Sequence, residues 1–139
     1  MYKKVMDFAK IQSGYTFRNS IAHDVSGDVG VIQAIDISRF SKNNLIFDYE
    51  ALIKISSKSL KRPNFLRQGD ILIISKASLE YPFRSMVYNG SRQNTIASSS
   101  VHVIRLKNNN VLPEYISIFL NSDVGQKLLR NVVESKAHI

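Results

Sequence analysis

The clearest pattern of hydrophobic and polar positions lies in the last third of the chain. Residues 101–106 alternate between apolar and polar side chains for most of their length, which predicts a half-buried strand. Pro113 fits the first position of a helix, where its missing N–H costs nothing. Asp123 and Gln126 have the spacing of a capping box, so a second helical segment is expected to begin there. Apolar residues recur on one helical face, which predicts helices that cover a sheet: Ile116, Phe119, Leu120, Val124 and Leu128.

Shorter apolar runs predict four strands upstream, at residues 29–34, 51–55, 71–75 and 83–88. The run at 71–75 is apolar on both faces, which predicts a central strand. Asn89-Gly90 predicts a hairpin turn. We therefore expect an α+β fold, a β-rich single domain over residues 1–139 with a twisted sheet or partly open barrel, closed by a C-terminal helix pair.

Composition favours a globular protein with a polyanionic partner. The chain has 139 residues, 44% of them apolar, and a net charge of +8. The surplus is local, because residues 54–92 contain eight Lys and Arg residues but only two Asp and Glu residues. Such a concentrated basic excess raises the expectation of a nucleic-acid partner. The absence of cysteine excludes disulfides and fits a cytoplasmic protein, and no apolar run is long enough to predict a membrane span.

Two segments contain side chains suited to contact with DNA bases. Residues 38–44 predict a loop rich in hydrogen-bond donors, and residues 92–94 follow the expected hairpin turn. Arg matches the edge of guanine, and Asn or Gln that of adenine, in the major groove. Solvated loops often have the same composition, so that interpretation stays open. With the cations expected to neutralise phosphates, the predicted DNA-binding set is Arg18, Arg39, Lys42, Asn43, Asn44, Lys61, Arg62, Lys76, Arg84, Arg92, Gln93 and Asn94.

The sequence shows no pattern typical of an enzyme. The glycine-rich loops that cradle phosphates are absent, and so is the Asn/Asp-Pro-Pro-Tyr/Phe motif of adenine methyltransferases. The histidines, at positions 23, 102 and 138, lack metal-ligand spacing. The serines at 98–100 with Lys76 favour a Ser–Lys hydrolase only weakly, because a serine run beside a strand usually satisfies backbone groups. We expect a non-catalytic protein with no cofactor and no metal.

Five short motifs occur in an order that resembles one protein family. Residues 97–101, 103–106, 112–115, 120–122 and 125–129 have the sequences ASSSV, VIRL, LPEY, LNS and GQKLL. In this order and spacing they resemble the end of a target recognition domain from the DNA specificity subunit of type I restriction-modification systems. The GDIL sequence at residues 69–72 is also typical of that family.

The resemblance implies a domain that binds double-stranded DNA and directs methyltransferase and restriction subunits to a site, without performing chemistry itself. The sequence departs from the family at one point, because the family's spacer helix is expected to be absent after residue 139. Two other functions stay open. An RNA or single-strand binder would carry aromatic side chains on an exposed sheet face, and the six tyrosines are too scattered to favour it. A basic protein-interaction module would bind an acidic partner.

Overall fold

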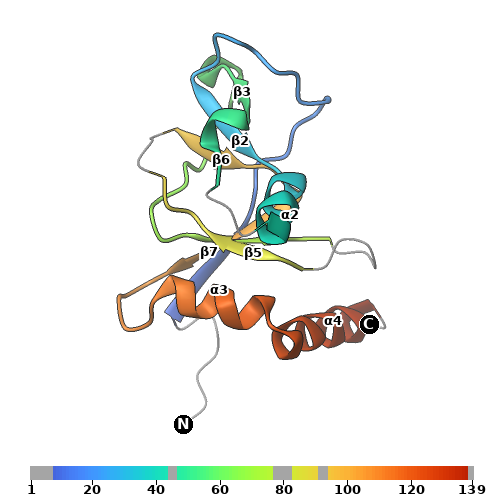
Figure 1. Ribbon diagram of the computed structural model, residues 1–139. Helices are drawn as coiled ribbons and strands as arrows, with labels where there is room; N and C mark the ends of the chain where they lie inside the picture. The colour runs from blue at the N-terminus through green and yellow to red at the C-terminus, as the bar shows by residue number, and fades with distance from the viewer. Residues whose placement is uncertain (1–7, 44–46, 77–82, 91–93, 138–139) are drawn as a thin grey trace.

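Two sheets and three helices organise the part of the chain that the computed structural model describes, residues 8–43, 47–76, 83–90 and 94–137. Figure 1 shows the sheet containing β2 and β3 above the sheet containing β5 and β7, with α3 and α4 at the bottom. The expected α+β class is confirmed, with similar amounts of helix and strand. The described strands form two open sheets and do not close into a barrel.

The larger sheet contains four antiparallel strands in the order β1 (Ala9–Ser13), β7 (Val101–Leu106), β4 (Ile71–Ile74) and β5 (Ser85–Val87). All four residues of β4 are buried, and β4 lies between two other strands, as its unbroken apolar run predicts. Leu72 pairs with Val103 across β4 and β7, and both belong to the main hydrophobic core. The edge strand β1 is mostly exposed, so one rim of this sheet faces solvent.

The smaller sheet contains three strands in the order β3 (Ile53–Ile55), β2 (Val29–Ile32) and β6 (Thr95–Ala97). β2 is antiparallel to β3 but parallel to β6. Two short 3-10 helices, η1 (Tyr49–Ala51) and η2 (Ser57–Ser59), flank β3. Val29, Val31, Ile55 and Ile96 form a second core under this sheet.

Successive strands do not stay in one sheet, so the chain passes between the two sheets four times. We call the linking residues the crossing segments: 14–28, 56–70, 88–94 and 98–100. Gly14 begins the first of them at a close approach of two backbones. A Cβ at Gly14 would lie 1.8 Å from the Ser98 carbonyl oxygen, so no larger residue fits there without a shift of the backbone.

Residues 38–43 lie in helix α2 (Ala34–Asn43), so the prediction of a loop at 38–44 is wrong for all of these residues. The helix begins with caps that no local pattern announces. Asp36 accepts a hydrogen bond of 2.7 Å from the Gln33 N–H, and Ser100 accepts one of 3.1 Å from the Ala34 N–H. Ile37 is fully buried in the main core and sets the face of α2 that packs. Ser100, which is distant in sequence, therefore stabilises the first turn of a helix that the local sequence pattern does not predict.

The predicted C-terminal helix pair is confirmed as α3 (Pro113–Asn121) and α4 (Asp123–Ala137). α3 packs on β5 through polar side chains. The Ser85 and Ser117 hydroxyls are 2.8 Å apart, and the Ser85 N–H donates to Asn121 Oδ1 at 2.7 Å. The cap of α4 is Ser122 rather than Asp123, because Ser122 Oγ accepts a hydrogen bond from the Gly125 N–H.

The predicted apolar face of the two helices is wrong for three of its five residues. Phe119, Val124 and Leu128 are 46%, 62% and 50% exposed, whereas Ile116 and Leu120 are half-buried. The hydrogen bonds of Ser117 and Asn121 orient α3, so a polar edge of the helix faces the sheet. Apolar side chains consequently remain in solvent on the outer surface of α3 and α4.

The prediction of a hairpin turn at Asn89-Gly90 is also wrong, because β5 and β6 belong to different sheets. The backbone of Tyr88, directly after β5, instead forms hydrogen bonds with the residues that precede β4. Its N–H donates to the Asp70 carbonyl at 2.7 Å, and its own carbonyl accepts from the Gly69 N–H at 2.9 Å. Gly69, with φ of 92°, is the one described glycine in the left-handed region.

Candidate nucleic-acid interface

Residues 60–68, which we call the cationic connector, lead out of the smaller sheet towards β4. Leu66 is buried and Leu60 and Pro63 are half-buried, so every third residue faces the protein. Lys61, Arg62, Asn64, Phe65, Arg67 and Gln68 are exposed between them. This spacing presents cationic and amide side chains to solvent on a segment whose backbone lies against the protein.

Three of the connector's hydrogen bonds join it to elements of the two sheets. The Lys61 N–H donates to the Tyr15 hydroxyl at 3.0 Å, and the Leu66 N–H donates to the Thr95 carbonyl at 2.8 Å. Arg105 Nη2 donates to the Phe65 carbonyl at 3.3 Å. The partners come from the loop after β1, from β6 and from β7, so elements of both sheets fix the connector. Rigid positioning of this kind is what a recognition segment needs.

A buried ion pair fixes the C-terminal end of the connector. Arg105 Nε donates to Asp70 Oδ1 at 2.9 Å and Arg105 Nη2 to Asp70 Oδ2 at 2.8 Å, which makes a two-point contact. Asp70 Oδ2 also accepts from the Arg67 N–H at 2.8 Å. The hydrogen bonds with Asp70 raise the pKa of the Arg105 guanidinium above its usual value. Asp70 is therefore neutralised by Arg105 inside the protein and does not pair with the exposed cations of the connector.

Backbone strain occurs at two predicted DNA-binding residues. Arg62 has φ of 50° and Asn94 has φ of 68°, and they are the non-glycine residues with positive φ in the described ranges. The left-handed backbone conformation of a residue with a side chain costs roughly 1–2 kcal/mol of stability, and residues in it concentrate at functional sites. Asn94 directly precedes Thr95, which accepts the hydrogen bond from the connector. Both strained residues therefore lie along β6 and the connector.

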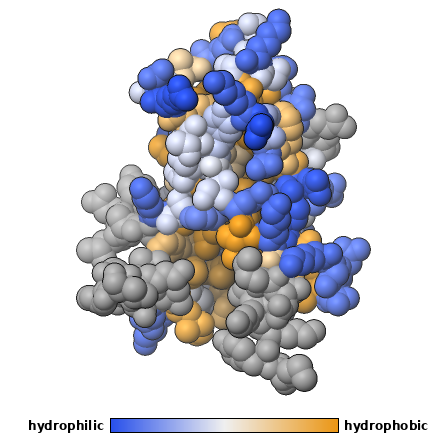
Figure 2. Space-filling view, turned by 180° about the vertical axis from the view of Figure 1, so that it is seen from behind, coloured by the Kyte–Doolittle hydropathy of each residue, from blue (hydrophilic) through white to orange (hydrophobic). Residues whose placement is uncertain are grey.

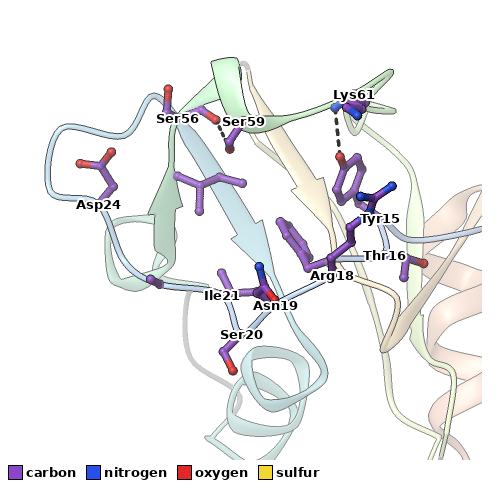
Figure 3. A pocket seen from close by; sticks show the side chains of 13 residues that line it. Tyr15, Thr16, Arg18, Asn19, Ser20, Ile21, Asp24, Ser56, Ser59 and Lys61 are labelled. Atoms are coloured by element: carbon purple, nitrogen blue, oxygen red, sulfur yellow. Dashed lines mark hydrogen bonds between the residues drawn. The ribbon is translucent and has the colours of Figure 1, made fainter.

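The loop after β1 adds a further cation beside the connector. Tyr15 and Lys61 lie together with Arg18 at one end of a surface pocket (Figure 3). On the other side of Tyr15, a cleft of about 90 Å³ is lined by residues that include Gln12, Arg62 and Asn64. Amide and guanidinium groups thus meet at one surface, and these are the groups that contact base edges and phosphates.

The positive charges on this surface are available to bind an anionic ligand. Within the described ranges, no carboxylate lies at ion-pair distance from Arg18, Lys61, Arg62 or Arg67. Figure 2 shows that hydrophilic side chains dominate the upper part of the rear face, over the smaller sheet, with apolar surface below them. Solvated, unpaired cations of this kind can exchange their counterions for phosphate groups.

Apart from Arg84, the predicted DNA-binding residues fall into four groups. Arg18, Lys61, Arg62 and Asn94 lie along the connector and its neighbours. Arg39 is exposed on α2 and Lys76 is exposed after β4, and neither lines the pockets beside the connector. Lys42 and Asn43 lie in α2, where the structure does not describe their side chains. Asn44, Arg92 and Gln93 lie outside the described residues, so the predicted base-reading triplet stays a prediction.

Arg84 has a structural contact that the sequence did not suggest. Its Nη1 donates to the Asn121 carbonyl at 2.9 Å, and the side chain is half-buried. This contact holds the end of α3, so we leave Arg84 out of the interface. Conversely, Arg67 and Asn64 belong to the connector surface but were missed as site residues. Their place in the same basic run of sequence was the signal that could have identified them.

The serine run at residues 98–100 has structural partners. The Ser98 and Ser100 hydroxyls are 2.8 Å apart, and Ser100 also caps α2. His23 Nδ1 accepts a hydrogen bond from the Lys54 N–H at 3.0 Å. Across the described ranges, no group of three or more His, Cys, Asp or Glu residues is arranged to hold a metal ion.

No protein-family model matches the chain, and no curated protein matches it. None of the helices in the described ranges combines the length and apolar character needed to cross a membrane.

Proposed function

We propose that the chain is a double-stranded DNA recognition domain of the kind found in specificity subunits of type I restriction-modification systems. The order of motifs between residues 97 and 129 supports the family, and the cationic connector supports the activity. The observation that carries the proposal is the connector itself. The connector backbone is fixed to both sheets by hydrogen bonds, and it carries Lys61, Arg62 and Arg67, which have no ion-pair partner among the described residues. Arg18 joins them beside Tyr15.

In the proposed mechanism, the four cations neutralise phosphates and set the register of the domain on the duplex. Amide groups at Gln12, Asn64 and Asn94 are then available to base edges. The domain performs no chemistry, and its role is to direct methyltransferase and restriction subunits to the site. A single-strand binder that stacks bases on a sheet is disfavoured, because none of the described strands contains Phe, Tyr or Trp and a single half-buried histidine, His102, lies on β7.

The salt dependence of duplex binding tests this proposal. Four phosphate contacts predict a slope of about −3.6 in a plot of log affinity against log salt, from roughly −0.9 per phosphate. Lys61→Ala should shallow that slope by about one unit and weaken all sequences alike. Lys127→Ala, an exposed cation on α4, is the matched control and should change neither. A flat salt response of the unaltered protein, or equal effects of the two variants, would contradict the proposal.

Sequence preference is measured separately, by selecting bound sites from a random duplex library. A target recognition domain should enrich one short motif, and Asn94→Ala should relax the preference at a base pair by about 1–3 kcal/mol if its amide contacts that base edge. If the selection enriches no motif, the protein binds duplex DNA without sequence preference and is not a target recognition domain.

The outer surface of α3 and α4 favours a second candidate function, contact with another protein. Leu112, Tyr115 and Ile118 are 70%, 72% and 71% exposed, and they extend the exposed apolar surface of Phe119 and Val124. A cleft of about 610 Å³ beside Ile118 is lined with Phe40, Phe47 and Tyr49 among others. Exposed large apolar side chains on neighbouring turns of a helix favour a protein contact site.

We propose that this surface is where a partner subunit docks, while the connector contacts DNA. Ile118→Ser with Tyr115→Ser should abolish co-purification with a co-expressed methyltransferase subunit. The same double variant should leave the duplex affinity and salt slope unchanged. Loss of DNA binding in the double variant would show that the two surfaces are not separate.

A further inference from the structure

A pocket of about 450 Å³ lies between residues 15–24 and the β3–η2 segment (Figure 3). Its volume is within the range of small-molecule sites, about 300–1,000 Å³. Every residue that lines it belongs to the described ranges. We call it the Tyr15 pocket, and its chemistry differs from one end to the other.

The end of the pocket next to the connector is built for an anion. Arg18 and Lys61 line it, and Asp24, the carboxylate in the pocket lining, lies at the opposite end (Figure 3) and forms no ion pair with either cation in the described ranges. The Tyr15 hydroxyl accepts a hydrogen bond from the Lys61 N–H, so its own hydrogen remains available to donate. A guanidinium, an ammonium and a hydroxyl donor at one place match the oxygens of a phosphate group.

The wall of the pocket is apolar and partly aromatic. Phe17 and Ile21 are half-buried against the core of the smaller sheet, which includes the buried Ile55. The rings of Tyr15 and Phe17 are 4.9 Å apart at 59°, which fixes Phe17 in position. Such a wall can hold a flat heterocycle by stacking and by burial of apolar surface.

Two polar side chains that line the Tyr15 pocket lack partners among the described residues. Within the described ranges, the side chains of Asn19 and Ser20 have no hydrogen-bonding partner. Phe17 and Ile21 pack against the core, but the backbone hydrogen bonds that this loop makes within the described ranges lie at its ends, where the Tyr15 N–H donates to the Ala97 carbonyl and the Asp24 N–H donates to the Lys54 carbonyl. The loop can therefore adjust to a ligand, and its amide and hydroxyl groups can bond to it.

From these features we infer that the Tyr15 pocket binds one nucleotide, with its phosphate at Arg18 and Lys61 and its base against Phe17 and Ile21. The ligand is a nucleoside monophosphate unit, either free or within a DNA strand from which its base has turned out. The second source rests on the proposed function, whereas the first does not. The pocket would give the domain a contact with a single unstacked base, in addition to contacts with the duplex surface.

Nuclear magnetic resonance titration of the whole chain tests the inference, with adenosine 5′-monophosphate, adenosine and inorganic phosphate as separate probes. Adenosine 5′-monophosphate should shift the backbone amide signals of residues 16–22 and 56–61. Its affinity should exceed that of either fragment, because each fragment uses only one end of the pocket. Arg18→Ala should weaken it by about tenfold, and the distant Lys127→Ala should not. Phe17→Leu keeps an apolar wall for folding but removes the aromatic ring, and should also weaken binding.

A second arm uses duplex DNA with 2-aminopurine, whose fluorescence rises when the base leaves the stack. A rise that Arg18→Ala suppresses, with both proteins saturated with duplex so that weaker binding is not the cause, would identify the DNA strand as the source of the nucleotide. Binding of the free nucleotide without any duplex binding would support the pocket and overturn the proposed function. The inference is overturned if inorganic phosphate binds as tightly as the nucleotide. It is equally overturned if no probe shifts these amides while the 2-aminopurine signal stays flat, even where the duplex binds with a steep salt slope.

Discussion

Arg105→Met is the substitution that tests how the connector is held. Methionine keeps the apolar stem of Arg105 against its neighbours but removes the guanidinium. Asp70, whose side chain is 2% exposed, then loses both of its charge-assisted bonds to Arg105. The Phe65 carbonyl loses its partner as well. Among the described residues, the variant therefore leaves a buried carboxylate whose remaining hydrogen-bond donor is the N–H of Arg67.

The expected loss of stability follows from the burial of the pair. Removal of one partner from a buried ion pair costs about 3–5 kcal/mol, because the remaining charge stays in the protein without compensation. Arg105 is 20% exposed, so water reaches one side of the pair and the lower value of about 3 kcal/mol is expected. For a chain of 139 residues this lowers Tm by roughly 10 °C.

Urea unfolding followed by circular dichroism measures the free energy of unfolding, and Lys127→Ala is the surface control, expected within about 0.5 kcal/mol of the unaltered protein. The double variant Asp70→Asn with Arg105→Met removes the buried charge together with its partner. It should recover part of the loss, which a double-mutant cycle detects as coupling. A loss below about 1 kcal/mol for Arg105→Met, or no recovery in the double variant, would refute the assignment of Asp70 as a buried, paired carboxylate.

Three more outcomes are expected in the same unfolding assay. Gly14→Ala should cost about 1–3 kcal/mol or more, because its Cβ meets the Ser98 carbonyl, whereas Gly30→Ala, whose Cβ has 3.4 Å to its nearest neighbour, should cost less. Burial raises the pKa of Asp36 above its ordinary value of 3.8, so the folded protein loses stability as pH rises from 3.8 through the raised pKa. Asp36→Asn should remove that loss, so the free energy of unfolding of the variant should increase relative to that of the unaltered protein as pH rises over this window. A difference in unfolding free energy that does not change with pH would contradict the burial effect. Phe119→Ala should cost well under the roughly 3–5 kcal/mol of a buried Phe, since the ring is 46% exposed; a full-sized loss would show that α3 packs differently.

The elements that the sequence predicted correctly are those with strong local signals. β7 occupies residues 101–106 because its alternating pattern suits a sheet with one buried face. β4 is central because an unbroken apolar run can be buried on both faces. Pro113 begins α3 because proline tolerates only the first turn of a helix. In each case a few adjacent residues suffice to determine the structure.

The elements that the sequence missed depend on distant residues. α2 is stabilised at its start by Ser100, which is 66 residues away along the chain. β6 pairs in parallel with β2 rather than forming a hairpin with β5, and no turn motif announces that choice. The candidate site shows the same division. The basic run predicted Lys61 and Arg62, but the hydrogen bond to Tyr15 that places them beside Arg18 is visible only in three dimensions.

The four crossing segments make the two sheets inseparable during folding, because neither sheet can be assembled from one contiguous piece of chain. Unfolding of one sheet removes the anchors of the other, so the domain should gain or lose its structure in a single step. The same arrangement separates the crossing segments, whose sequences can diversify, from the paired strands, whose sequences cannot. A flexible loop that doubles in length costs only about 0.6 kcal/mol in closure entropy. Evolution can therefore lengthen or replace the residues of 14–28 or 56–70 one crossing at a time, and obtain new binding preferences, while the strand pairings that align those residues stay unchanged.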